Sequence, residues 1–182
     1  MRLDLYQNSE YSPGASLLQQ ALWFFIGDRL VQSRLLPFRS FKVGILRLFG
    51  AKIGLGVNVK PGVKIKFPWR LVVGDHVWLG ENVWIDNLAT VTVESHVCIS
   101  QGAYLCTGNH DWSDVAFGLK TGEIYLQEGC WLGAKTAIAP NVIVGRGAIL
   151  TLGSVALCSL DPMTIYTGNP ARAIRTRTIT QS

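Results

Sequence analysis

The sequence predicts an all-β solenoid, a parallel β-helix built from six-residue repeats, with a helical cap at its N-terminal end. Beginning at Ile53, the chain divides into units of six residues, and an aliphatic residue leads each unit. The fifth residue of most units is small or β-branched. Such a unit suits a short strand and a turn, with its first side chain pointing inward. The first fifty residues lack this period and show helical spacing of apolar residues instead.

Three units make one triangular coil, so the repeat also predicts how the coils stack. The units read IGLGVN VKPGVK IKFPWR, VGDHVW LGENVW IDNLAT and VESHVC ISQGAY LCTGNH, and after a break LQEGCW LGAKTA IAPNVI and VGRGAI LTLGSV. Two additional residues separate the early coils and fit at a corner. Neighbouring coils then pair as parallel strands about 4.8 Å apart. We expect this β-helix over residues 51–167.

The N-terminal segment, residues 1–50, admits two interpretations. Apolar residues recur at helical spacing over 12–36, with Ser12 placed to begin the helix. The segment can act as a helical cap that shields the open edge of the first coil. Basic residues beside apolar ones between 39 and 47 equally suit an amphipathic segment in peripheral contact with an anionic membrane.

Composition narrows the class of protein. The chain of 182 residues is 48% hydrophobic and carries a net charge of +5, which suits one domain and an anionic ligand or surface. It shows no helix-turn-helix or zinc-finger pattern, so we expect no nucleic-acid partner. Its four cysteines form no CxxC pair and its first residues do not resemble a signal peptide. We therefore expect free thiols, a cytoplasmic location and no metal. Residues 168–182 are expected to form a C-terminal tail.

The repeat separates one histidine from the other two. His76 and His96 occupy the same turn position in consecutive coils, which predicts solvated corner residues stacked on one another. His110 is the last residue before the pattern breaks at 111–125, a stretch too long for a corner. Aromatic residues also recur at the outward sixth position, which suggests a subunit interface or a ligand groove. This aromatic set comprises Trp78, Trp84, Tyr104 and Trp131.

Imidazole is a natural general base at neutral pH, and no GxSxG nucleophile elbow lies near His110. A base without a nucleophile favours direct transfer, in which His110 deprotonates an acceptor hydroxyl that attacks a bound donor.

The hexads together with TGNHDW, WLGAKTAIAPNVIVG and YTGNPARAI resemble the left-handed β-helix acetyltransferases that use acetyl-CoA. The run from VKPGVK to IDNL is most similar to the colanic-acid-biosynthesis branch, which is tied to exopolysaccharide synthesis. The resemblance implies a left-handed helix, a homotrimer with active sites between subunits, and O-acetylation of a sugar or polysaccharide-precursor acceptor.

The same resemblance implies roles for individual residues. His110 would be the general base, and the backbone at Gly133 and Ala134 would line the donor channel, with an amide assisting the developing oxyanion. Leu152 and Gly153 would lie one coil further along that channel. The remaining assignments are Arg172 for the coenzyme A phosphates and Trp78, Asn87 and Trp112 for the acceptor.

Departures from the family pattern keep alternatives open. Leu152 adds bulk beside the donor channel, and Leu157 and Cys158 replace a usual Thr-Lys pair. A non-catalytic trimeric scaffold with a degenerate donor site is therefore an alternative. A zinc hydratase like the γ-class carbonic anhydrases needs a close histidine pair, which the spacing of the three histidines does not provide. Whether the acceptor atom is oxygen or nitrogen stays open.

Overall fold

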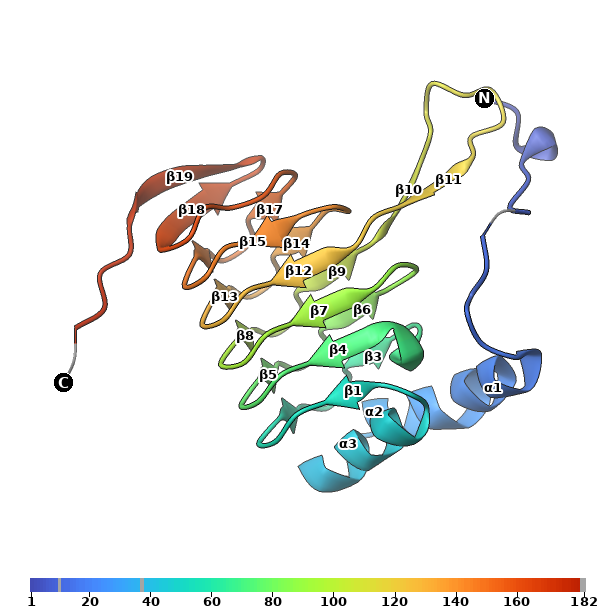
Figure 1. Ribbon diagram of the computed structural model, residues 1–182, viewed down its shortest axis with the longest axis horizontal. Helices are drawn as coiled ribbons and strands as arrows, with labels where there is room; N and C mark the ends of the chain where they lie inside the picture. The colour runs from blue at the N-terminus through green and yellow to red at the C-terminus, as the bar shows by residue number, and fades with distance from the viewer. Residues whose placement is uncertain (10, 37, 181–182) are drawn as a thin grey trace.

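The computed structural model describes residues 1–9, 11–36 and 38–180. It is a left-handed parallel β-helix with a helical cap across its first coil (Figure 1). Each coil contributes one short strand to each of three faces, and the fold class expected from the hexads is confirmed. The described residues contain no helix long and apolar enough to cross a bilayer.

The three faces are parallel sheets of five, seven and five strands, with one antiparallel strand at the end of the second. Face 1 contains β1 (Lys52–Ile53), β4 (Leu71–Val73), β7 (Val91–Val93), β12 (Ile124–Leu126) and β15 (Ile143–Val144). Face 2 contains β2 (Asn58–Val59), β5 (Trp78–Leu79), β8 (Cys98–Ile99), β13 (Trp131–Leu132), β16 (Ile149–Leu150), β18 (Thr164–Gly168) and β19 (Ala171–Thr176). Face 3 contains β3 (Lys64–Ile65), β6 (Trp84–Asp86), β9 (Tyr104–Cys106), β14 (Ala137–Ile138) and β17 (Val155–Ala156).

The leading aliphatic residue of each hexad stacks on its counterpart in the next coil, as predicted. On face 2, Leu79 is in register with Ile99, Ile99 with Leu132, and Leu132 with Leu150. All four are buried. The core is therefore one continuous column of aliphatic side chains, and the corner histidines lie outside it. The rings of His76 and His96 stack with centroids 5.2 Å apart, which confirms their predicted corner positions.

The N-terminal cap consists of η1 (Leu3–Leu5), α1 (Leu17–Leu22), the π-helical turn η2 (Trp23–Gly27), α2 (Asp28–Gln32) and α3 (Arg39–Leu48). The expected helix start at Ser12 is wrong. Gly14 has φ +81°, outside the helical region, and Ser16 caps α1 by accepting a hydrogen bond from Gln19 N at 3.2 Å. The buried side of α3 packs against β1 and β2 of the first coil.

Two expected boundaries also differ. The excursion is a hairpin of β10 (Gly108–His110) and β11 (Leu119–Thr121), and Ile124 and Tyr125 already belong to face 1. The expected excursion over 111–125 therefore begins and ends too late. Residues 171–176 of the expected C-terminal tail form β19, which turns back antiparallel along β18, so the hydrogen-bonded ladder extends to Thr176. A single regular period cannot reveal strands that leave it.

Candidate functional site

His110 lies at the base of the excursion, where the chain leaves the solenoid. The chain departs from face 3 after Cys106, forms β10 and β11, and joins face 1 at Ile124 (Figure 1). In this hairpin His110 is paired with Leu119. The repeat places the histidine at this corner, and the antiparallel pairing holds its backbone in place.

The orientation of the imidazole is set by Phe117. Nδ1 of His110 lies 2.9 Å from the backbone carbonyl oxygen of Phe117, and the two rings stack with centroids 4.3 Å apart and planes 4° from parallel. A carbonyl oxygen can only accept a hydrogen bond, so Nδ1 must carry the proton. The lone pair of Nε2 is then free to accept a proton from a substrate. Tyr6 packs on the imidazole with its ring centroid 5.9 Å away.

Other contacts brace the excursion. Lys120 Nζ lies 2.7 Å from a carboxylate oxygen of Asp111, and this ion pair lowers the pKa of Asp111. The backbone N–H of Asp111 donates to Gly118 O at 2.8 Å, and that of Arg2 donates to Val115 O at 2.7 Å. The N-terminal segment and the excursion therefore support each other beside His110.

The expected donor residues form a groove at a different corner. Trp131, Gly133, Ala134 and Leu152 line a cavity of about 340 Å³ where face 2 turns into face 3. A Cβ at Gly133 would lie 2.7 Å from Leu152 N, so a glycine is needed for the close approach of these coils. Gly153 lies on the same turn as Leu152, with φ +69°. Arg172 is exposed on β19, two strands from β16 of the groove.

One expected acceptor contact is wrong. Asn87 is fully buried, its Oδ1 accepts from Phe67 N at 2.9 Å, and its Nδ2 donates to Phe67 O at 2.7 Å. Both polar atoms of the amide are thus used to join two successive coils. Trp78 is exposed on face 2, and Trp112 is exposed in the excursion, two residues after His110.

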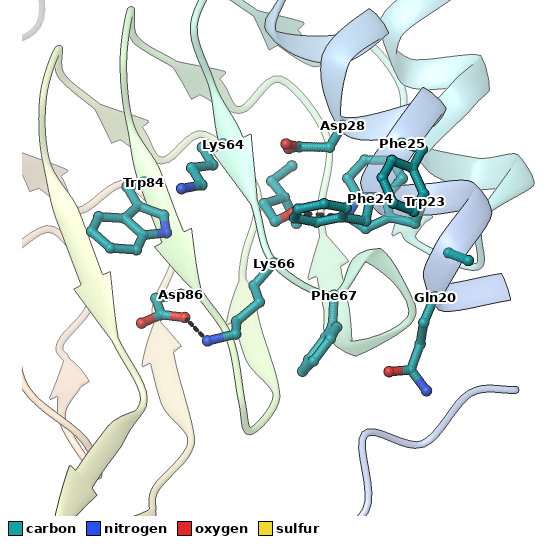
Figure 2. Close-up of a pocket in the computed structure, with 12 residues that line it drawn as sticks. Gln20, Trp23, Phe24, Phe25, Asp28, Lys64, Lys66, Phe67, Trp84 and Asp86 are labelled. Carbon is teal, nitrogen blue, oxygen red and sulfur yellow. Dashed lines mark hydrogen bonds and ion pairs between the residues drawn. The ribbon is translucent and has the colours of Figure 1, made fainter. Parts of the chain in front are cut away.

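A pocket that the sequence did not indicate lies between the N-terminal helices and face 3 (Figure 2). It has a volume of about 460 Å³. Aromatic side chains from both elements form its walls, and charged side chains project into it from face 3 and from α2. The lining includes Trp23, Phe24, Phe25, Asp28, Lys64, Lys66, Phe67, Trp84 and Asp86.

The charged groups of this pocket are ordered in pairs. Lys66 Nζ lies 3.0 Å from Asp86 Oδ1, and Lys64 Nζ lies 4.8 Å from the centre of the Trp84 ring (Figure 2). Burial raises the pKa of Asp28, whose Oδ2 accepts a hydrogen bond from Gln32 at 2.6 Å. The pocket therefore offers apolar walls with a few oriented polar groups, the usual composition of a small-molecule site.

Register connects this pocket to His110. Asp86 is paired with Cys106, the last residue of face 3 before the excursion. Tyr104 Oη donates to the second oxygen of Asp86 at 3.3 Å. The pocket thus lies on the side of the solenoid where the excursion leaves it. The aromatic residues Trp84 and Tyr104 at the sixth position of their hexads indicated that a partner or ligand covers face 3. The helical segments α1 and η2 that complete the pocket do not follow the hexad period and could not be placed from it.

Two of the four thiols are poorly suited to nucleophilic attack, and the described part of the chain shows no cluster of metal-ligating side chains. Burial raises the pKa of Cys130 to about 12 and also raises that of Cys98. A thiol with a raised pKa is a poor nucleophile near neutral pH. No group of three or more His, Cys, Asp or Glu side chains is placed to hold a metal ion among the described residues.

The base and the donor groove lie at different corners of one chain. His110 follows face 3 and precedes face 1, whereas Gly133 follows face 2 and precedes face 3 (Figure 1). Every coil passes the three faces in the same order, so these two corners stay separate in every coil. One corner of a single chain therefore cannot hold both the base and the donor groove.

Comparison with known proteins agrees with this architecture. No protein-family model matches the chain. It is 36% identical over 168 residues to the colanic acid biosynthesis acetyltransferase WcaF of Escherichia coli K12, covering 92% of each chain. A Vibrio cholerae hexapeptide-repeat acetyltransferase, solved with acetyl coenzyme A, superposes with a TM-score of 0.80 at 21% identity, covering 91% of this chain and 92% of that one.

A maltose O-acetyltransferase of Clostridium difficile has a TM-score of 0.76 at 18% identity, with 90% of each chain covered. These structures share the fold, and the full-length similarity to the E. coli protein shows the family. The chain belongs to the hexapeptide-repeat acetyltransferases, in the branch named for colanic acid biosynthesis.

Proposed function

We propose that the protein transfers an acetyl group from acetyl-CoA to a hydroxyl of a sugar in an exopolysaccharide or its precursor. The observation that carries this proposal is the contact of His110 Nδ1 with Phe117 O, which leaves Nε2 as a proton acceptor. The E. coli relative is named for colanic acid biosynthesis, and a neighbour in fold is a maltose O-acetyltransferase. These names support a sugar hydroxyl as the acceptor.

The chemistry needs one base and no covalent enzyme intermediate. Nε2 of His110 takes the proton of the acceptor hydroxyl as its oxygen attacks the carbonyl carbon of the thioester. The carbon–sulfur bond then breaks, and the imidazolium returns the proton to the leaving thiolate. A backbone N–H at the turn of Gly133 and Ala134 would stabilise the oxyanion that forms between these two steps.

The donor and acceptor have separate places in this proposal. Acetyl-CoA would occupy the groove of Gly133, Ala134 and Leu152, with Arg172 near its phosphates. The sugar would enter the pocket of Trp84 and Asp86, where an aromatic face and a carboxylate can contact its ring and its hydroxyls. Four free cysteines suit the reducing cytoplasm, which we propose as the location.

We also propose that the active unit is a homotrimer, because His110 and the donor groove lie at different corners of one chain. A cyclic arrangement lets each copy present its groove to the His110 of its neighbour. Mixing tests this idea. At low acetyl-CoA, subunits with His110→Ala should be inactive and subunits with Leu152→Glu should be only weakly active. When the two kinds are unfolded and refolded together, the activity should exceed that of either kind alone. Random pairing would restore about a quarter of the sites.

If mixed trimers form but are no more active than the Leu152→Glu subunits alone, each site is contained in one chain and this part of the proposal is wrong.

The catalytic role of His110 is tested by acetyl-CoA turnover with a sugar acceptor. His110→Ala should lower kcat by roughly 10²- to 10⁴-fold, the usual contribution of a general base. The matched control is His96→Asn, because His96 is a corner histidine with φ 62° and asparagine tolerates that backbone. The control should keep its activity. A His110→Ala enzyme with unchanged kcat would remove His110 from the mechanism.

The alternative is a non-catalytic scaffold, and it is favoured by the bulk of the exposed Leu152 in the donor groove. Calorimetry with acetyl-CoA separates the two functions. An enzyme must bind the donor, whereas a scaffold with a degenerate groove shows no heat of binding up to millimolar donor.

A further inference from the structure

The end of the solenoid covered by α3 presents an exposed surface that neither pocket uses. We define the basal surface as Arg34, Leu35, Phe38, Arg39, Phe41 and Leu48, from α3 and the connection before it. The four apolar side chains are 90%, 70%, 47% and 82% exposed, in chain order. Figure 1 shows α3 lying across the end of the molecule beyond the first coil. Large exposed apolar side chains gathered on one helix and the connection before it often mark an interaction site.

An apolar stripe runs along the outer side of α3, between exposed basic residues. Phe41, Gly44 and Leu48 recur at spacings that place them on one side of the helix, and all three are exposed. The opposite side, which includes Val43 and Leu46, is buried against the first coil. A Cβ at Gly44 would meet no atom within 4 Å, so the middle of the outer side is open.

Positive charge is concentrated around this surface. Residues 11–55 contain six lysines and arginines and one acidic residue, so this stretch carries the whole net charge of +5. The other eleven basic residues and eleven acidic residues of the chain cancel. Within the described residues, the side chains of Arg29, Arg34, Arg39 and Lys52 have neither an ion-pair nor a hydrogen-bond partner, and all four are exposed. Their charge is available to an external partner.

We propose that the basal surface docks on an anionic phospholipid bilayer. Apolar side chains flanked by unpaired cations match the interface of such a bilayer. The apolar side chains can insert at the boundary of the acyl chains, and the anionic headgroups attract the cations. A second copy of this chain is a poor occupant, because two surfaces that each carry the excess positive charge would repel. The proposed trimer joins corners of the solenoid, and this leaves its ends uncovered.

This proposal goes beyond the acetyl transfer and is independent of it. The basal surface contains no residue assigned to the base, the donor groove or the acceptor pocket. Vesicle binding is measured without donor or acceptor. A protein that fails as an enzyme can therefore still bind vesicles, and an active enzyme can fail to bind them.

Flotation of the full chain with vesicles tests the docking. We expect binding to phosphatidylcholine vesicles that contain phosphatidylglycerol and little binding to pure phosphatidylcholine. The binding should weaken as salt shortens the Debye length from ~10 Å at 0.1 M toward ~3 Å at 1 M. Failure to bind the anionic vesicles at low salt, or equal binding to both kinds, overturns the proposal.

Gly44 provides a matched pair of variants. Gly44→Lys and Gly44→Glu add side chains of similar length to an open position, and both improve on glycine as helix formers. One basic residue near an anionic leaflet strengthens binding about fivefold. Gly44→Lys should therefore bind roughly 30-fold more tightly than Gly44→Glu. Equal binding of the two variants contradicts docking through this surface.

Replacement of the apolar side chains tests the apolar contribution to docking. Phe41→Ser and Leu48→Ser should reduce vesicle binding at high salt, where attraction of the cations is screened. Both side chains are exposed, so circular dichroism should show an intact fold. If these variants change only the sedimentation of the protein and leave vesicle binding unaltered, another copy of the chain covers the surface and the proposal is wrong.

Discussion

His110 Nδ1 and the backbone carbonyl oxygen of Phe117 lie 2.9 Å apart, and the rings of the two residues stack almost in parallel. The hydrogen bond selects the tautomer, and the stack restrains the plane of the imidazole. Phe117 has φ 53°, in the left-handed region that a bulky side chain rarely adopts. The excursion thus holds an unfavourable backbone conformation at the residue that orients the base.

Phe117 is a positioning residue, and its variants should separate orientation from stability. Phe117→Gly keeps the carbonyl and suits the positive φ, but it removes the ring that restrains His110. We expect kcat to fall by roughly tenfold while the KM for acetyl-CoA stays the same, since imperfect orientation costs rate rather than donor binding. Phe117→Tyr preserves the stack and should restore most of kcat. Equal loss in both variants would indicate general damage to the excursion.

Leu152 is exposed in the donor groove, which makes it a sensitive position for donor binding. Leu152→Glu places a negative charge beside the expected path of a polyanionic coenzyme. The KM for acetyl-CoA should rise by about tenfold or more, since a like charge disfavours the ligand by ~1.4 kcal/mol or more at such a site. Leu55→Glu is the control, because Leu55 is equally exposed at a corner of the first coil, far from the donor groove. A larger effect in the control would move the donor site to that corner.

Asn87 should matter for stability and not for acceptor binding. Asn87→Ala leaves the N–H and the carbonyl of Phe67 without their partner, at a cost of about 1–3 kcal/mol per group. Thermal denaturation should show a lower Tm, while the KM for the acceptor stays unchanged. A raised acceptor KM at normal Tm would return Asn87 to the acceptor site.

Lys42 lies on the buried side of α3, and its Nζ has no hydrogen-bond partner among the described residues. Burial lowers the pKa of Lys42 below its ordinary value of 10.5. Between that lowered pKa and about 10.5 the unfolded chain binds more protons than the folded one, so stability rises with pH. Lys42→Met should remove this rise.

The same substitution should raise Tm by a few degrees at neutral pH, since 1 kcal/mol corresponds to ~2–4 °C at this chain length. Lys52→Met provides the control, because Lys52 is exposed and should leave the pH dependence of Tm intact. An unchanged pH profile in Lys42→Met would mean that the ammonium group is solvated in the folded protein.

The parts of the fold that follow a period could be predicted from the sequence. Leu79, Ile99 and Leu132 repeat at one position of the hexad, so their stacking follows from pattern alone. The pocket of Trp84 and Asp86 could not be found in this way, because α1 and η2 reach it from a distant part of the chain. The buried position of Asn87 could not be predicted for a related reason. A polar residue at a corner can face solvent or bridge two coils, and the hexad pattern is identical in the two cases.

The antiparallel turn of β19 along β18 has a consequence for assembly. A parallel solenoid that simply stopped would expose a row of backbone groups that another solenoid could continue. Here the final strand runs in the opposite direction and carries exposed Arg172 and Arg175. An incoming parallel strand of another solenoid would meet a strand of the opposite direction with a charged edge. The end of face 2 is therefore closed to a further parallel strand, and α3 lies across the other end of the solenoid. Both features disfavour end-to-end growth and leave the sides of the solenoid as the surfaces for association.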